Sequence, residues 1–146
     1  MKKFKFSLDK VLEYRNHLQR REKDILARLR TEYSLLLEEE RQLLDLYEKA
    51  KRDYEMRSAA GLLVADAAIM LNHIDDIKKQ IELQRVKIIE KEHEIEKQTK
   101  KVVAITQDKM TVEKLREKKF EIYTGEVVKS EEKFIEDFIA NRKSIS

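Results

Sequence analysis

Apolar residues recur at alternating spacings of three and four along residues 8–54, which places them on one face of an α-helix. Two overlapping series share this period. The first series comprises Leu8, Val11, Leu18, Ile25, Leu29, Leu36, Leu43, Leu46 and Ala50. The second series comprises Leu26, Leu29, Tyr33, Leu36, Leu43, Tyr47, Ala50 and Tyr54. Charged residues interrupt them at Arg15, Glu22, Glu32, Glu39 and Glu40. Together the series predict one helix over about 7–58 with a stripe wider than a minimal two-stranded seam.

Capping residues define the ends of this helix. The hydroxyl of Ser7 is placed to cap the first free backbone N–H groups, and Asp9 complements the positive end of the dipole. Gly61 is suited to the left-handed conformation that ends a helix, and Asp66 is suited to cap the next one. We therefore predict a turn at about 59–65. One unbroken helix of about 130 residues is the alternative, because a single Gly costs only about 1 kcal/mol in a helix.

A second helix is predicted over about 66–141. Its apolar seam positions are Ala67, Met70, Ile74, Ile77, Ile81, Ile88, Ile95, Val102, Ile105 and Val112. Polar residues occupy the remaining seam positions, at Gln84, Lys91, Gln98 and Lys109. Such residues fix the register of a coiled coil at some cost in stability. After Val112 the phase slips and continues as Phe120, Tyr123, Val127, Phe134 and Phe138.

Folding at Gly61 predicts an all-α protein: one domain, 1–146, that is a long antiparallel two-helix coiled-coil hairpin. Residue 7 then lies near residue 117, and about 25 residues of the second helix extend beyond the first. All five phenylalanines gather at the open end, at Phe4, Phe6, Phe120, Phe134 and Phe138. Phe4, Phe6 and Phe120 either close off the core or form a docking surface. Phe134 and Phe138 lie beyond the first helix and predict a docking surface.

Composition agrees with long helices, since 42% of the residues are charged, 41% are hydrophobic, and Gly and Pro number two and zero. No cysteine is present, which favours a reducing, cytosolic setting. The basic N-terminus lacks the apolar core of a signal peptide, and nothing reaches the roughly 20 apolar residues of a membrane span, so we expect a soluble protein. Residues 1–30 hold ten basic and four acidic side chains, which favours an acidic protein partner over nucleic acid.

Residue patterns for catalysis or cofactor binding are lacking. Phosphate loops need several nearby glycines, and the two present are far apart. His17, His73 and His93 lack metal-site spacing, and carboxylate runs such as 38–40 predict solvated helix faces, because a two-helix hairpin has no pocket to shift their pKa values. We expect a protein-binding module that is not an enzyme and has no cofactor, metal site or catalytic residue. Tyr33, Tyr47 and Tyr54 either pack across the hairpin or contact a partner.

Three segments in order, 4–15 (FKFSLDKVLEYR), 112–119 (VEKLREKK) and 131–139 (EEKFIEDFI), together with the chain length, resemble the FliJ family of flagellar export proteins. Members are cytoplasmic parts of the flagellar type III export apparatus and resemble the central stalk coiled coil of rotary ATPases. They insert into the export ATPase hexamer, connect it to the cytoplasmic domain of the export gate, and bind export chaperones. The chain departs from the family at Glu136-Asp137-Phe138, where an acidic pair often precedes a small residue.

The resemblance implies a stalk and coupling protein of flagellum biogenesis and motility, associated with the membrane apparatus through proteins only. We expect the ATPase to contact the open end, at Phe4, Phe6, Arg15, Arg116, Phe120, Tyr123, Phe134 and Phe138. We expect the gate to contact the middle of the hairpin, at Leu43, Leu46, Tyr47, Ala50, His73 and Ile77. The alternatives are an escort chaperone that holds unfolded clients, a coiled-coil spacer that dimerises, and a member of a virulence secretion system.

Overall fold

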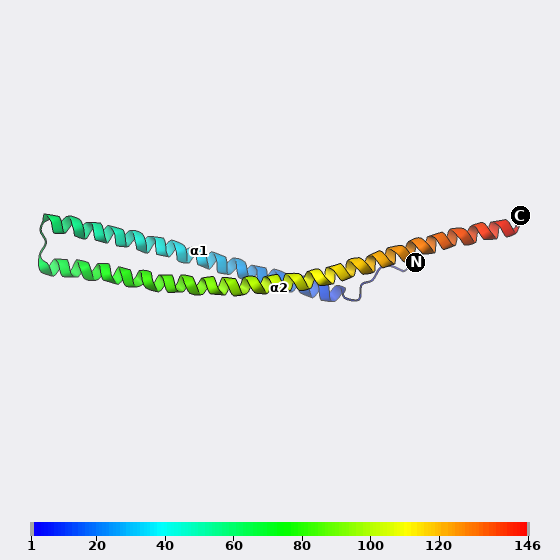
Figure 1. Cartoon of the computed structure of the whole chain (residues 1–146), viewed down its shortest axis with the longest axis horizontal. Helices are drawn as coiled ribbons and strands as arrows, with labels where there is room; N and C mark the ends of the chain where they lie inside the picture. The colour runs from blue at the N-terminus through cyan, green and yellow to red at the C-terminus, as the bar shows by residue number, and fades with distance from the viewer. Residues whose placement is uncertain (1, 146) are drawn as a thin grey trace. The chain divides into compact units, whose positions relative to one another are not determined.

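Two long helices make up the structure, a computed structural model that describes residues 2–145 and, of Ile145, the backbone only. Helix α1 spans Asp9–Ala60 and helix α2 spans Val64–Ile145, with a connection of three residues between them (Figure 1). No strand occurs within the described residues. The two helices pack against each other in opposite directions, which confirms the predicted all-α helical hairpin.

Helix α1 begins one turn after a buried aromatic anchor. The side chain of Phe6 is only 6% exposed, and its carbonyl accepts a hydrogen bond of 3.1 Å from the backbone N–H of Asp9. The first helical bond runs from the N–H of Leu12 to the carbonyl of Leu8 at 2.9 Å. Leu8 therefore occupies the capping position predicted for Ser7, because the packing of Phe6 sets where the chain turns into the helix.

The hairpin turn lies at Gly61, as predicted, so the alternative of one unbroken helix is wrong. Gly61 has a φ of +98°, in the left-handed region that side chains with a Cβ avoid, and its N–H donates to the carbonyl of Ser58 at 3.3 Å. Helix α2 starts with the N–H of Ala67 bonded to the carbonyl of Leu63 at 2.9 Å. Asp66 consequently lies inside the first turn of α2 and does not cap it.

The chain divides into two compact units, which we describe separately. The closed unit is Glu22–Lys101 and contains the turn. The terminal unit combines the described residues of the segments 1–21 and 102–146. In both units a part of α1 packs antiparallel to a part of α2.

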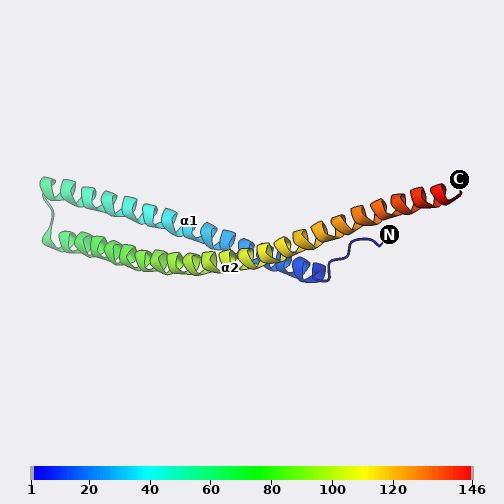
Figure 2. The ribbon, with the colours of Figure 1, turned by 45° about the vertical axis from the view of Figure 1, so that its right-hand side comes forward.

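In the closed unit the core follows the seam predicted for α2. Every seam position from Ala67 to Gln98 is buried or half-buried, and Ile77 is 1% exposed. The two helices lie side by side in this unit (Figure 2). On α1 the second apolar series forms the seam, since all its members from Leu26 to Tyr54 are buried or half-buried whereas Leu46 of the first series is exposed. The two series share Leu29, Leu36, Leu43 and Ala50 and differ by one position elsewhere, as at Leu46 and Tyr47. That difference is a rotation of about 100°, and only contact with α2 selects between the two.

Polar side chains at the seam of the closed unit reach across to α1. Gln84 donates to the backbone carbonyl of Leu36 and to the Glu39 carboxylate, both at 2.9 Å. Gln98 donates to the backbone carbonyl and carboxylate of Glu22, at 3.0 and 2.6 Å. Glu22 is 1% exposed overall, and Lys101 Nζ lies 3.3 Å from its other carboxylate oxygen. These contacts satisfy buried polar groups only in one register of the two helices.

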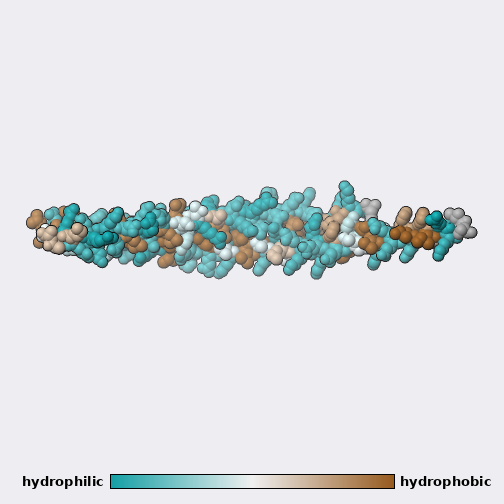
Figure 3. Space-filling view, turned by 90° about the horizontal axis from the view of Figure 1, so that it is seen from above, coloured by the Kyte–Doolittle hydropathy of each residue, from teal (hydrophilic) through white to brown (hydrophobic). Residues whose placement is uncertain are grey.

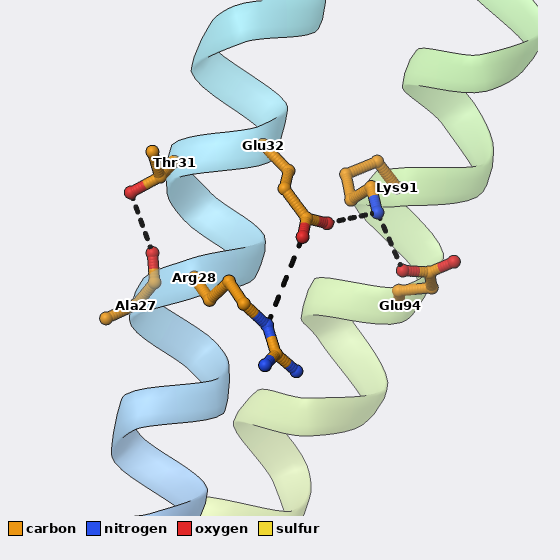
Figure 4. A network of polar contacts seen from close by, with 6 residues as sticks. All are labelled: Ala27, Arg28, Thr31, Glu32, Lys91 and Glu94. Atoms are coloured by element: carbon orange, nitrogen blue, oxygen red, sulfur yellow. Dashed lines mark hydrogen bonds and ion pairs between the residues drawn. The ribbon is translucent and has the colours of Figure 1, made fainter.

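Lys91 forms the centre of a network of charges (Figure 4). Its ammonium lies 2.7 Å from Glu32 on α1 and 3.1 Å from Glu94 on α2, and Arg28 approaches Glu32 at 4.0 Å. The hydrogen bond from Lys91 holds the pKa of Glu32 below its ordinary value, and the bond to Glu32 raises the pKa of Lys91. The pair therefore stabilises the folded chain most at pH values between the ordinary values of the two groups, 4.5 and 10.5.

The terminal unit shows the same cross-hairpin pairing. Gln19 donates to Thr106 Oγ1 at 3.0 Å and accepts from Lys109 at 3.0 Å. The guanidinium of Arg116 lies 3.2 Å from the Asp9 carboxylate, which agrees with the predicted proximity of residues 7 and 117. Val112 and Phe6 supply the buried apolar residues of this unit.

Replacing Ile77 with Ala tests the seam of α2. The variant removes a fully buried side chain, so we expect a loss of about 2–4 kcal/mol in the free energy of unfolding. The matched control, Ile69→Ala, changes a side chain on the same helix that is 67% exposed, and we expect a change within about 0.5 kcal/mol. Urea unfolding followed by circular dichroism measures both. Equal losses in the two variants would contradict the seam.

Replacing Glu32 with Gln tests the charge network through pH. The folded-state pKa of Glu32 lies below its unfolded value, so its contribution is present above pH 4.5 and lost as the pH falls through the folded-state pKa. The wild-type melting temperature should exceed that of the variant at pH 7, and the two should converge as the pH falls below the folded-state pKa of Glu32. Glu55→Gln is the control, because Glu55 has no charge partner among residues 2–145. A difference unchanged at low pH would contradict the assignment.

Candidate docking surfaces

An aromatic cluster, which we call the terminal cluster, joins the N-terminal segment to α2. It consists of Phe4, Arg116, Phe120 and Tyr123. The ring of Phe4 meets that of Phe120 edge to face, with centroids 5.2 Å apart and an interplanar angle of 78°. The centroid of the Tyr123 ring lies 5.5 Å from that of Phe4. The guanidinium of Arg116 stands over the Phe4 ring at 5.3 Å. These geometries are attractive for aromatic pairs and for a cation over a ring.

Backbone contacts complete this attachment of the N-terminus. The hydroxyl of Tyr123 donates to the carbonyl of Lys2 at 2.7 Å, and Phe6 is buried beside the first turn of α1. Five of the residues expected to meet the ATPase therefore pack against one another or into the core of the terminal unit. They are Phe4, Phe6, Arg116, Phe120 and Tyr123. Phe120 remains 49% exposed, so the cluster closes the core and still presents an aromatic surface.

Arg15, also expected at the ATPase end, belongs to the seam of the terminal unit. Its guanidinium lies 3.4 Å from the carboxylate of Asp108 on α2, and its side chain is 34% exposed. Its Nε is buried without a hydrogen-bond partner in the described residues. Most of this arginine is consequently committed to contacts within the hairpin.

A basic hollow of about 1000 Å³ opens beside the terminal cluster. Its lining residues are Lys2, Lys3, Phe4, Lys5, Lys119, Ile122, Tyr123 and Glu126. Four lysines and one glutamate are among its lining residues, together with apolar and aromatic ones, so the hollow is suited to an acidic segment of a partner. Sequence analysis identified the basic N-terminus but not the contribution of Lys119 and Ile122, although the pair Lys118-Lys119 was a visible signal.

The last turns of α2 carry large apolar side chains that stay about half or more exposed among the described residues. Phe134 is 73% exposed and Phe138 is 57% exposed, and Ile135 and Ile139 lie beside them at 56% and 48%. Figure 3 shows hydrophobic atoms gathered toward the C-terminal end of the chain. Phe134 and Phe138 thus differ from the other three phenylalanines, which contact the rest of the terminal unit.

The residues expected to meet the export gate all lie in the closed unit. Ile77 is part of the core and cannot contribute accessible surface. Leu43, Tyr47 and Ala50 are half-buried in the seam, with Lys78 5.7 Å from the Tyr47 ring. Leu46 and His73 are exposed, and a hollow of about 200 Å³ includes His73 and Ala50 in its lining. The accessible part of this surface is therefore narrower than predicted.

Three tyrosines on α1, Tyr33, Tyr47 and Tyr54, lie on the side of the helix that faces α2. The hydroxyl of Tyr33 donates to the Glu92 carboxylate on α2 at 2.9 Å, and this bond raises the pKa of Tyr33. Tyr47 and Tyr54 are half-buried at seam positions. Of the two interpretations of these residues, packing across the hairpin fits Tyr33 and Tyr47 directly.

Metal sites and membrane spans are the other features to consider. Within residues 2–145, no three potential metal ligands lie together, and neither helix contains a segment apolar enough to cross a membrane. Comparison of the chain with protein-family models, curated proteins and solved structures finds no match. The docking surfaces are consequently the features from which a function can be argued.

Two Phe→Ala variants test the assignment of the aromatic residues. Phe4→Ala removes an edge-to-face pair and the contact with Arg116, so we expect a loss of about 1–2 kcal/mol in the free energy of unfolding and faster exchange of the Asp9 and Leu12 amides, which bond to the Phe6 and Leu8 carbonyls. Phe134→Ala, the matched control, should change stability by less than about 0.5 kcal/mol in dilute protein. Urea unfolding and hydrogen exchange measure these effects, and a larger cost for Phe134 would reverse the assignment.

Proposed function

We propose that the chain is a non-enzymatic component of the flagellar type III export apparatus, which binds the export ATPase ring as a central stalk and couples it to the export gate. The observation that carries this proposal is the location of the three segments that resemble the FliJ family. All three, 4–15, 112–119 and 131–139, belong to the terminal unit. The first two are joined there by the contacts of Phe4 and Asp9 with Arg116.

Physical properties of the terminal unit support ATPase docking at this end. The hairpin brings the N-terminal segment against the late part of α2, so one partner can contact both. The basic hollow offers four lysines to acidic groups, and Phe134 and Phe138 offer apolar area. Charge complementarity speeds the encounter, while buried aromatic anchors supply most of the binding free energy.

The closed unit is the proposed contact for the cytoplasmic domain of the gate. Exposed Leu46 and His73 support this assignment, whereas Ile77 is withdrawn from it. Export chaperones are further proposed partners, and association with the membrane apparatus occurs through these proteins in the cytoplasm. The resemblance does not distinguish a flagellar system from a virulence secretion system.

Titrating the cognate export ATPase with this protein tests the stalk role. We expect saturable stimulation of steady-state ATP hydrolysis, because a stalk bound in the ring favours its catalytically competent arrangement. A flat response with both proteins folded would overturn the proposal.

A double variant, Phe134→Ser with Phe138→Ser, tests the docking surface. We expect the concentration for half-maximal stimulation to rise at least tenfold while the helical circular dichroism signal is kept, since loss of two aromatic anchors removes at least about 1.4 kcal/mol of binding. The matched control replaces two exposed apolar residues of the closed unit, Leu83 and Ile89, with Ser and should leave the titration unchanged. Loss of helicity in the Phe134/Phe138 variant would show that these two residues belong to the core and would contradict the docking surface.

An escort chaperone remains the second candidate, favoured by the exposed apolar side chains at the end of α2. This role predicts suppressed aggregation of varied unfolded clients without any effect on ATP hydrolysis. A light-scattering assay with unrelated clients separates the two candidates, because a stalk should not protect them.

A further inference from the structure

The end of α2 carries a face with a symmetric pattern of side chains. We call it the C-terminal face and define it by Glu131, Phe134, Ile135, Phe138, Ile139 and Arg142. Their spacings of 3, 4, 7, 8 and 11 from the first residue place all six on one side of the helix. Two apolar pairs occupy the middle, and charges of opposite sign occupy the ends. Along the helix axis the face therefore reads charged, apolar, apolar, charged in both directions, with only the signs of the two charges exchanged.

The C-terminal face is not covered by any other part of the chain that the structure describes. All six side chains are exposed, including four large apolar ones. Neither the side chain of Glu131 nor that of Arg142 forms an ion pair or hydrogen bond with any described residue. The two charges are 11 residues apart, roughly 16 Å along the helix, which is too far for them to pair with each other.

The geometry points to a second copy of this chain as the occupant of the C-terminal face, bound antiparallel about a two-fold axis between residues 136 and 137. In this arrangement Glu131 of each copy lies opposite Arg142 of the other, which gives two symmetry-related ion pairs. Phe134 then faces Ile139 of the second copy, and Ile135 faces its Phe138. A two-fold contact uses one patch on both copies and so requires such self-complementarity.

The charge pattern selects this orientation over a parallel one. A parallel pair in register would set Glu131 beside Glu131 and Arg142 beside Arg142, and like charges in contact are unfavourable. The antiparallel pair replaces both repulsions with attractions. The antiparallel pair also gives the C-terminal face of α2 a second helix to pack against.

The contact is small and therefore weak. Two helices touch over about three turns, which is less area than a standard stable interface buries. We expect a dimer that forms in the micromolar range or above and weakens as salt screens the exposed ion pairs. This inference does not depend on the export role. The two uses of Phe134 and Phe138 compete, so a bound ATPase would displace the second copy.

Sedimentation velocity of the full chain at about 5 to 500 µM tests the inference. The wild type should shift from monomer to dimer with concentration. Glu131→Arg and Arg142→Glu should each lower the association constant at least about tenfold, because the two-fold axis repeats every change. The chain carrying both substitutions should recover wild-type association. An equimolar mixture of the two single variants should form a heterodimer.

Charge reversals on the opposite side of the same turns serve as controls. Glu136→Arg and Lys133→Glu change the charge by the same amounts as the test variants but lie off the C-terminal face, so association should stay at the wild-type level. Circular dichroism confirms that every variant is helical. A wild type that is monomeric throughout, a dimer insensitive to the single reversals, or a double variant that fails to recover would each overturn the inference. The ATPase titration reports on the proposed function independently.

Discussion

The buried carboxylate of Glu22 is the constraint on which the closed unit depends. A carboxylate that is 1% exposed is strongly destabilising unless its oxygens are bonded, and Gln98 and Lys101 supply those bonds from α2. Sliding α2 by one heptad in one direction would place Ile105 opposite Glu22 and leave its carboxylate without the Gln98 bonds. Sliding it in the other direction would bring Lys91 to Glu22 but remove Lys91 from Glu32, to which it is bonded at 2.7 Å. An apolar seam alone tolerates such a slide, because Ile and Leu layers resemble one another. The polar layers therefore determine which residue of α1 faces which residue of α2.

The terminal unit has polar cross-hairpin contacts of its own. There, Gln19 contacts Thr106 and Lys109, and Asp9 contacts Arg116. The N-terminal segment of this unit packs against Phe120 and Tyr123, and the described side chains of α2 from Lys129 onward are all exposed. The division of the phenylalanines into packed and exposed groups follows from where α1 begins. It does not follow from any difference in their local sequence.

Aromatic residues near both chain ends consequently have different physical roles. Phe4 and Phe120 lose exposed area to each other and to Tyr123, so most of their contribution stabilises the hairpin. Phe134 and Phe138 keep more than half of their area in water, and a second protein surface gains from covering them. Any partner of this face gains from the same apolar area, so the proposed self-association and the proposed ATPase docking would exclude each other.

The sequence by itself determined the two helices, the turn at Gly61 and the seam of α2, because heptad spacing and a glycine suited to positive φ are local signals. It did not decide which α1 series forms the seam. Leu46 and Tyr47, for example, both have largely apolar side chains and differ only in the side of the helix from which they project. The residues expected at the docking surfaces were located in part: Ile77 and Phe6 proved buried. Only the tertiary structure decided these points, because burial of a side chain depends on the facing helix, which the local pattern does not specify.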